Sequence, residues 1–164
     1  MPVRGDSVEP VDIEIRVAVP DERALLEALQ LRASLVWEDT RDALLAHPDA
    51  ILLPEEWIDA GRVRVATVAG RLVGFSVVLP KAERVAELDG LFVEPDRMRA
   101  GVGRKLLQDA VAAGAYDRID VIANLNALGF YRKVGFVEIG PVATRFGPAV
   151  QMSASAHDIR VSSR

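Results

Sequence analysis

Two glycines separated by one residue, Gly101 and Gly103, stand at the predicted start of a helix that follows an apolar strand. A helix start leaves about four backbone N–H groups without partners, and these groups lie at the positive end of the helix dipole. Because glycine has no Cβ, a phosphate group can approach the backbone closely there. The spacing therefore predicts a loop that binds a phosphate-bearing ligand, in particular a pyrophosphate.

Two other phosphate-binding loops require residues that this sequence lacks. A Walker loop needs Gly-x-x-x-x-Gly-Lys-Ser/Thr, which is not present. A dinucleotide-binding loop needs a third glycine at position 106, where Leu106 stands. A plain strand-to-helix connection without a ligand stays open as an alternative. Basic side chains around the turn favour an anionic ligand in this otherwise acidic chain: Arg97, Arg99, Arg104 and Lys105.

Together with a second segment, this loop resembles the GNAT superfamily of N-acetyltransferases, which use acetyl-coenzyme A. That family has Gln/Arg-x-x-Gly-x-Gly/Ala at the start of its central helix, after a strand that ends in Val-x-Pro. Residues 98–103 read Met-Arg-Ala-Gly-Val-Gly after Val-Glu-Pro, so Met98 stands where Gln or Arg is usual. Residues 124–136 resemble the family's Asn-x-x-Ala-x-x-Phe-Tyr-x-x-x-Gly-Phe box. The resemblance covers residues 62–140 well and the N-terminal third in outline.

The resemblance implies acetyl-coenzyme A as cosubstrate and no metal. In the family, backbone groups of the strand before the loop hold the pantetheine arm as an added strand would. The N–H of Phe92 or Val93 is then expected to polarise the acetyl carbonyl. Asn124 is expected to cap its helix and to contact the pantetheine. The implied coenzyme-binding residues are Leu91, Phe92, Val93, Met98, Arg99, Ala100, Gly101, Val102, Gly103, Arg104 and Asn124.

Acetyl transfer to a primary amine needs a neutral amine, yet a lysine-like amine has a reference pKa of about 10.4. The resemblance implies Glu87 as the base, acting through water. Asp89 shares its parity on the strand and is the second candidate for the base, and either carboxylate could instead bind the ammonium. Tyr131 falls where relatives place a phenol near the coenzyme sulfur, and a reference pKa of about 10 keeps it protonated as the acid. The implied reaction is direct attack by the amine in a ternary complex.

Hydrophobic periodicity predicts the elements that position these residues. Their alternation indicates a mixed, mostly antiparallel sheet with helices on both faces, an α/β fold in which 85–122 forms a right-handed parallel crossover. The resemblance adds a splayed strand pair. We expect Pro80 to close its strand. The predicted strands are 11–19, 62–67, 72–79, 85–93, 119–122, 136–139 and 149–153, and the predicted helices are 20–37, 40–46, 55–60, 101–114 and 124–134.

Length and composition limit the organisation of the chain. Its 164 residues suit one domain, and we expect a flexible leader at 1–10, a single acetyltransferase domain at 11–155 and a polar tail at 156–164. The absence of cysteine excludes disulfides, thiolate zinc sites and a cysteine nucleophile. A net charge of −4 argues against a nucleic-acid partner.

The sequence has no apolar stretch long enough to span a bilayer and no secretory signal, so we expect a cytoplasmic protein without a membrane partner. The acceptor is expected to be a small-molecule or peptide amine, and a homodimer is possible. The alternative function is a non-catalytic coenzyme A sensor or a partner-docking domain on the same fold.

Overall fold

The computed structural model describes residues 12–163. For residues 38–40 it describes the backbone but not the side chains. The leader expected at 1–10 lies outside the described residues. In that described part no helix is long and apolar enough to cross a membrane. The elements are β1 (Ile13–Val17), α1 (Arg23–Ser34), α2 (Glu38–Ala46), α3 (Glu55–Asp59), β2 (Val63–Val68), β3 (Arg71–Ala82), β4 (Val85–Val93), α4 (Val102–Gly114), β5 (Arg118–Asn124), α5 (Leu128–Val134), β6 (Val137–Thr144), β7 (Gly147–Ser155) and α6 (Ala156–Val161), with short 3-10 turns between some of them.

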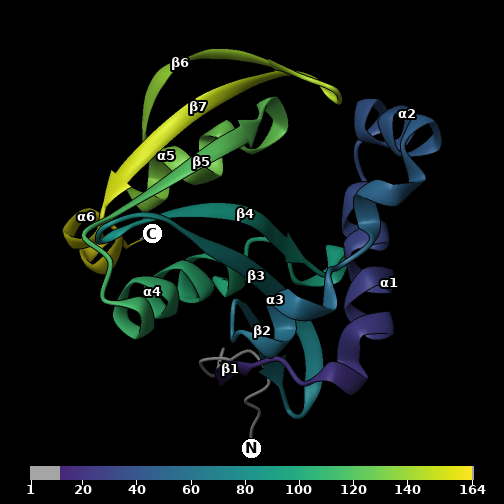
Figure 1. Cartoon of the computed structure of the whole chain (residues 1–164), viewed down its shortest axis with the longest axis horizontal. Coiled ribbons are helices and arrows are strands. Elements are labelled where there is room, and N and C mark those ends of the chain that lie inside the picture. Colours follow the sequence, from purple (N-terminus) through teal and green to yellow (C-terminus); the bar gives the residue numbers. More distant parts are fainter. Residues whose placement is uncertain (1–11, 164) are drawn as a thin grey trace, which may run out of the picture.

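The strands form a sheet in the order β1-β2-β3-β4-β5-β7-β6 (Figure 1). β4 and β5 pair in parallel through the crossover that contains α4, and the other neighbouring strands pair antiparallel. A mixed, mostly antiparallel sheet is therefore confirmed, including the parallel unit predicted for residues 85–122.

Helices cover both faces of the sheet, as predicted. On one face, Leu26 and Leu29 of α1 pack with Ile58 of α3 against β3. On the other face, Leu107 of α4 and Ile159 of α6 belong to one buried cluster with residues of α5, β4 and β5. Burial of each of these aliphatic side chains contributes about 2 kcal/mol. The two cores hold β4 between α1 and α4, so the elements predicted to carry the chemistry are fixed from both sides.

β3 does not end at Pro80, which corrects our expectation. The strand runs on to Ala82, and Pro80 lies opposite Ala86 of β4. The N–H of Val78 donates to the carbonyl of Arg62, just before β2. Two residues later, the nitrogen of Pro80 points the same way. Because β3 and β2 run in opposite directions, it faces the segment before Arg62, which is not part of β2 and offers no strand partner. Proline is tolerated there because no ladder hydrogen bond is lost.

The C-terminal segment forms a helix where we expect a polar tail. The hydroxyl of Ser155 accepts a hydrogen bond from the N–H of Asp158 (3.1 Å) and so caps α6. Ile159 is fully buried, and its carbonyl accepts a hydrogen bond from the side chain of Gln108 on α4 (3.2 Å). One buried residue per turn is enough to dock a short helix, although its composition is polar.

Candidate active site

β4 and β5 separate in the middle of the sheet (Figure 1). Their parallel pairing runs from Val85 with Arg118 to Leu88 with Val121 and goes no further, although both strands continue. We call the region between residues 89–93 of β4 and 122–124 of β5 the β4–β5 opening. It confirms the predicted splayed pair. An extended ligand can bind along such an unpaired edge as an added strand.

The backbone direction of β4 decides which N–H groups face this opening. The N–H of Glu94 donates to the carbonyl of Val73 on β3 (2.8 Å). Since N–H directions alternate along a strand, the N–H of Phe92 also points towards β3. The N–H groups of Leu91 and Val93 therefore point into the opening. Of the two residues that we expected to polarise an acetyl carbonyl, Val93 is suitably oriented and Phe92 is not.

The loop after β4 leads into an uncapped start of α4. Arg99 and Gly101 have positive φ angles of 68° and 88°, and Gly101 is the N-cap residue, without a side-chain capping hydrogen bond. Nothing lies within 4 Å of the position that a Cβ on Gly101 would take. Among the described residues, the N–H groups of 102–104 have no acceptor, and they lie at the positive end of the helix dipole, as an anion site requires. Met98 and Arg99 are both exposed.

Gly103 has a packing role that we did not predict. A Cβ on this residue would lie 2.8 Å from the ring of Phe130 on α5 and 3.6 Å from Leu91. The missing Cβ makes room for Phe130, because this side of α4 packs against α5. The N–H of Gly103 still belongs to the uncapped first turn of the helix.

The side chains of Arg104 and Asn124 are held by nearby backbone. Nη2 of Arg104 donates to the carbonyl of Ser163 (3.3 Å), whereas its Nε is buried without a hydrogen-bond partner among the described residues. Asn124 ends β5, and its side chain accepts a hydrogen bond from the N–H of Asn126 (2.8 Å). The predicted capping role of Asn124 is thereby confirmed, for the 3-10 turn that precedes α5.

A β-bulge in β4 lies where the two strands separate. Val77 pairs with Gly90 and Val78 with Leu88, so Asp89 is an extra residue without a partner on β3. Leu88 and Leu91 both pack with the core on the α4 face. In a regular strand, residues three positions apart would face opposite sides. The bulge therefore interrupts the regular alternation that we assumed for this strand.

Glu87 and Asp89 are close in space and have no partners. Within residues 12–163, neither carboxylate forms an ion pair or a side-chain hydrogen bond. Partial burial raises the pKa of Asp89 above its ordinary value, and the charge of Glu87 raises it further.

The neighbouring carboxylate, Asp120, is fully engaged. It lies beside Glu87 in the β4–β5 register and accepts hydrogen bonds from Lys81 (2.8 Å), Arg118 (3.0 Å) and Ser153 (2.8 Å). Burial alone would raise its pKa, but these hydrogen bonds outweigh burial and lower the pKa to about 2. Asp120 is a structural anion, whereas Glu87 and Asp89 keep free lone pairs.

Tyr131 lies in the core beside the end of the β4–β5 pairing. It shares a buried cluster with Leu88 and Val121, and its ring contacts those of Phe130 and Phe136 edge to face, with centroids 5.1 Å and 5.2 Å away. Burial raises the pKa of its phenol, so the group stays protonated. In the described part of the chain its hydroxyl forms no hydrogen bond.

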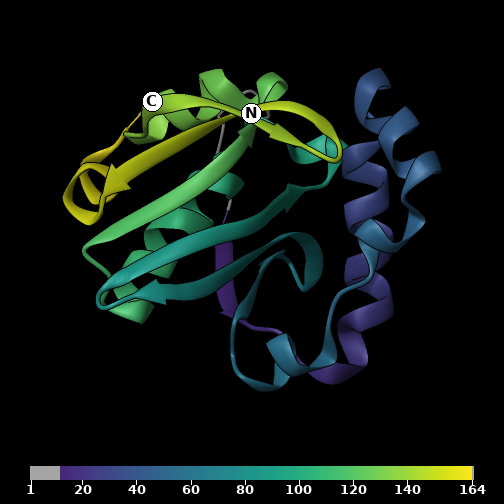
Figure 2. The same cartoon turned by 45° about the horizontal axis from the view of Figure 1, so that its top comes forward.

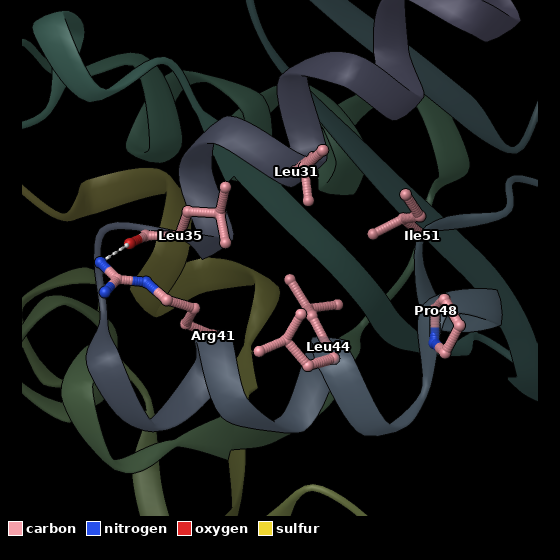
Figure 3. A pocket seen from close by; sticks show the side chains of 7 residues that line it. Leu31, Leu35, Arg41, Leu44, Pro48 and Ile51 are labelled. Atoms are coloured by element: carbon pink, nitrogen blue, oxygen red, sulfur yellow. Dashed lines mark hydrogen bonds between the residues drawn. The ribbon is translucent and has the colours of Figure 1, made fainter.

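A pocket of about 230 Å³ lies between α1, α2 and the 3-10 turn at Pro48–Ile51 (Figure 3). Arg41 at its edge donates a hydrogen bond to the carbonyl of Leu35 (3.2 Å). The other side chains that line it are apolar: Leu31, Leu35, Leu44, Leu45, Pro48 and Ile51.

We call α1, α2 and the 3-10 turn at Pro48–Ile51 the helical arm. The turn between β6 and β7 lies beside it (Figure 2). The rings of His47 and Phe146 meet at a right angle, with centroids 5.4 Å apart, and Arg145 forms an ion pair with Asp49 (3.4 Å). We call these two contacts the hairpin clasp. Sequence reasoning assigned no role to Arg145 or Phe146. No local pattern identifies contacts between segments about 100 residues apart.

Comparison with known proteins agrees with this geometry. Residues 59–138 match the model of the acetyltransferase (GNAT) domain family. The fold is similar to that of the PaiA N-acetyltransferase of Thermoplasma acidophilum, solved in complex with coenzyme A (TM-score 0.72, 19% identity, 88% of this chain and 99% of that chain). It is also similar to the ribosomal-protein-S18-alanine N-acetyltransferase of Escherichia coli (TM-score 0.62, 20% identity, 88% and 94%).

A GCN5-related N-acetyltransferase from Rhodopseudomonas palustris is a further similar structure (TM-score 0.68, 22% identity, 90% of this chain and 98% of that chain). No curated protein sequence matches the chain significantly. At these identities the structural likeness shows a common fold, and the family match adds the acetyltransferase domain. Residues 59–138 thus match the acetyltransferase (GNAT) domain family, and the fold of the described chain is similar to that of solved N-acetyltransferases.

Proposed function

We propose that this protein transfers the acetyl group of acetyl-coenzyme A to a primary amine, by direct attack of the amine in a ternary complex. One observation carries the proposal: two stretches of backbone without hydrogen-bond partners in the described chain follow each other along one segment. The edge of β4 lacks a partner at 89–93, and the uncapped start of α4 follows directly. An extended arm that ends in a diphosphate matches both surfaces.

The residues present fit acetyl-coenzyme A. The N–H groups of Leu91 and Val93 would hold the pantetheine arm, and the first-turn N–H groups after Gly101 would hold the diphosphate. Met98 replaces the usual Gln or Arg, and Arg97 and Arg99 stand close by to supply positive charge. The coenzyme A bound in the PaiA structure supports the same ligand class here. When bound, acetyl-coenzyme A supplies a thioester carbon that is open to attack.

Tyr131 would donate a proton to the departing sulfur. Its buried phenol stays protonated at neutral pH, and its hydroxyl is free to donate among the described residues. Glu87 and Asp89 would supply the negative charge that draws a cationic amine to the opening and takes up its proton. The site therefore favours acceptors that arrive as ammonium ions, either small molecules or peptide amines.

Calorimetry and an acetylation assay test this function in sequence. Coenzyme A and acetyl-coenzyme A should bind the protein and raise its melting temperature, because a ligand that binds only the native state stabilises it. A mixed library of amines, incubated with protein and acetyl-coenzyme A, should then give at least one product heavier by an acetyl group. Absence of binding at millimolar ligand would contradict the proposal. Binding without transfer to any amine class would favour a coenzyme A sensor instead.

A further inference from the structure

We infer that Asp89, the bulged residue of β4, accepts the proton of the attacking amine, and that Glu87 acts on Asp89 rather than on the substrate. This inference rests on the proposed acetyl transfer and names a further catalytic residue for it. Sequence reasoning favours Glu87 as the base and leaves Asp89 as the alternative, and the two assignments can be separated by experiment.

The first argument is position. Leu88 and Val121 form the last pair between β4 and β5, so Asp89 is the first residue of β4 beside the opening. Glu87 lies one position before that pair, in register with Asp120, where the strands are still joined. A group that must meet substrate inside the opening is therefore better placed at 89 than at 87.

The second argument is the direction of the side chain. Leu88 packs on the α4 face, so alternation along β4 turns Asp89 to the opposite face, which is the face of Glu87. The bulge then resets the alternation, and Leu91 packs on the α4 face again. Asp89 is therefore exposed on the same face as Glu87, and the charge of Glu87 acts on it.

Residues of this chain can accept and donate every proton that moves in the reaction. As the bond between the amine nitrogen and the acetyl carbon forms, Asp89 takes the proton that the nitrogen loses. As the carbon–sulfur bond breaks, Tyr131 gives its phenolic proton to the sulfur. The products are the amide and a free thiol, and a proton returns from Asp89 to Tyr131 through solvent before the next turnover.

Glu87 would make Asp89 a better base. Its negative charge favours the protonated form of Asp89, which raises proton affinity towards that needed at neutral pH. Among the described residues, several charges on elements packed against β4 are held in ion pairs, whereas Arg104 and Lys105 of α4 are in none. Asp120 is paired with Lys81 and Arg118, and Arg32 of α1 is paired with Glu94 (2.6 Å).

The test compares Asp89→Asn and Glu87→Gln by pH profiles of kcat and kcat/KM, with an amine identified in the library assay. Asp89→Asn should lower kcat about 10²- to 10³-fold with little change in acceptor KM, and Asp89→Glu should restore part of the loss. Glu87→Gln should lower kcat less than about tenfold and shift the acid limb of kcat/KM to lower pH, because the pKa of Asp89 falls when its neighbour is neutral. Glu83→Gln, on the turn between β3 and β4, is the matched control.

Three outcomes separate the possibilities. If Asp89→Asn raises acceptor KM and leaves kcat unchanged, Asp89 binds the ammonium and the inference is wrong. If Glu87→Gln abolishes turnover while Asp89→Asn does not, Glu87 is the base. Coenzyme A affinity and the melting temperature of each variant report whether the fold is retained. A wild-type protein that acetylates no amine contradicts the proposed function itself, before either variant is made.

Discussion

The ring of Phe130 lies so close to Gly103 that a Cβ on the glycine would come within 2.8 Å of it. Phe130 also contacts Tyr131 edge to face. The start of α4, which would hold the diphosphate, is therefore packed through one side chain against the residue that would protonate the sulfur. The position of Tyr131 depends on a glycine to which the sequence pattern assigns a different task.

Gly103→Ala should consequently disturb catalysis more than coenzyme binding. The new methyl group displaces the end of the Phe130 ring, and this strain offsets the gain of about 1 kcal/mol in helix propensity. We expect kcat to fall several-fold through the displaced Tyr131, with coenzyme A affinity changed less than about threefold. Steady-state kinetics and calorimetry measure the two effects. A large loss of affinity at unchanged kcat would restore the phosphate-approach role for Gly103.

Gly101→Ala should have the opposite pattern. There is room for the methyl group, but a φ of 88° is unfavourable for any residue with a Cβ. We expect a loss of about 1 kcal/mol in unfolding free energy and at least tenfold weaker coenzyme A binding, because relaxing φ turns the first-turn N–H groups away from the ligand. Gly129→Ala is the matched control, since that glycine lies in α5 with open space and an ordinary φ. It should leave binding unchanged.

Tyr131→Phe should separate catalysis from stability. Without the phenolic proton donor we expect kcat to fall about 10²-fold at saturating substrates. Unfolding free energy should stay constant or rise, because the hydroxyl forms no hydrogen bond among the described residues and its removal leaves no buried group unpaired. Because burial raises the pKa of Tyr131, the wild type should keep its acid function to a pH above 10, and no alkaline loss of kcat below that pH should trace to this residue. An unchanged kcat in the variant would remove Tyr131 from the mechanism.

The sequence allows prediction of those features that depend on local pattern. The alternation of β4 and the two glycines beside α4 identify the strand and the helix, and the strand-helix-strand order of 85–122 identifies the parallel pair. The bulge at Asp89 is different, because it is defined only by the register of β3 against β4. The same holds for Pro80, whose tolerance depends on where β2 begins. The role of Gly103 depends on Phe130, in a different helix. Each of these features arises from pairing or packing between different elements, which no local pattern specifies.

Asp120→Asn should test the structural anion beside Glu87. The folded-state pKa of about 2 lies below the ordinary 3.8, so ionised Asp120 stabilises the native state above pH 4, and this contribution is lost as pH falls through 2. At pH 7 we expect the variant to lose about 2 kcal/mol of unfolding free energy. The cost stays moderate because Lys81 and Arg118 are about half exposed and regain water. Denaturant titrations at several pH values should show the difference between wild type and variant shrinking below pH 4. A constant difference down to pH 2 would contradict this account.

The hairpin clasp offers a way to ask where the acceptor enters. The ring contact between His47 and Phe146 should contribute about 1 kcal/mol, whereas the exposed ion pair between Arg145 and Asp49 should contribute less than that. Phe146→Ala should therefore release the hairpin from the helical arm more than Arg145→Ala does.

If the clasp borders the acceptor path, Phe146→Ala should raise acceptor KM several-fold and leave coenzyme A affinity unchanged, because β4 and the start of α4 lie on other elements. Bulky amines that the wild type rejects should gain activity relative to small ones. Competition between a small and a bulky amine, followed by mass spectrometry, measures this ratio directly. An unchanged product ratio in both variants would mean that the acceptor reaches Asp89 by a path that the β6–β7 turn does not border.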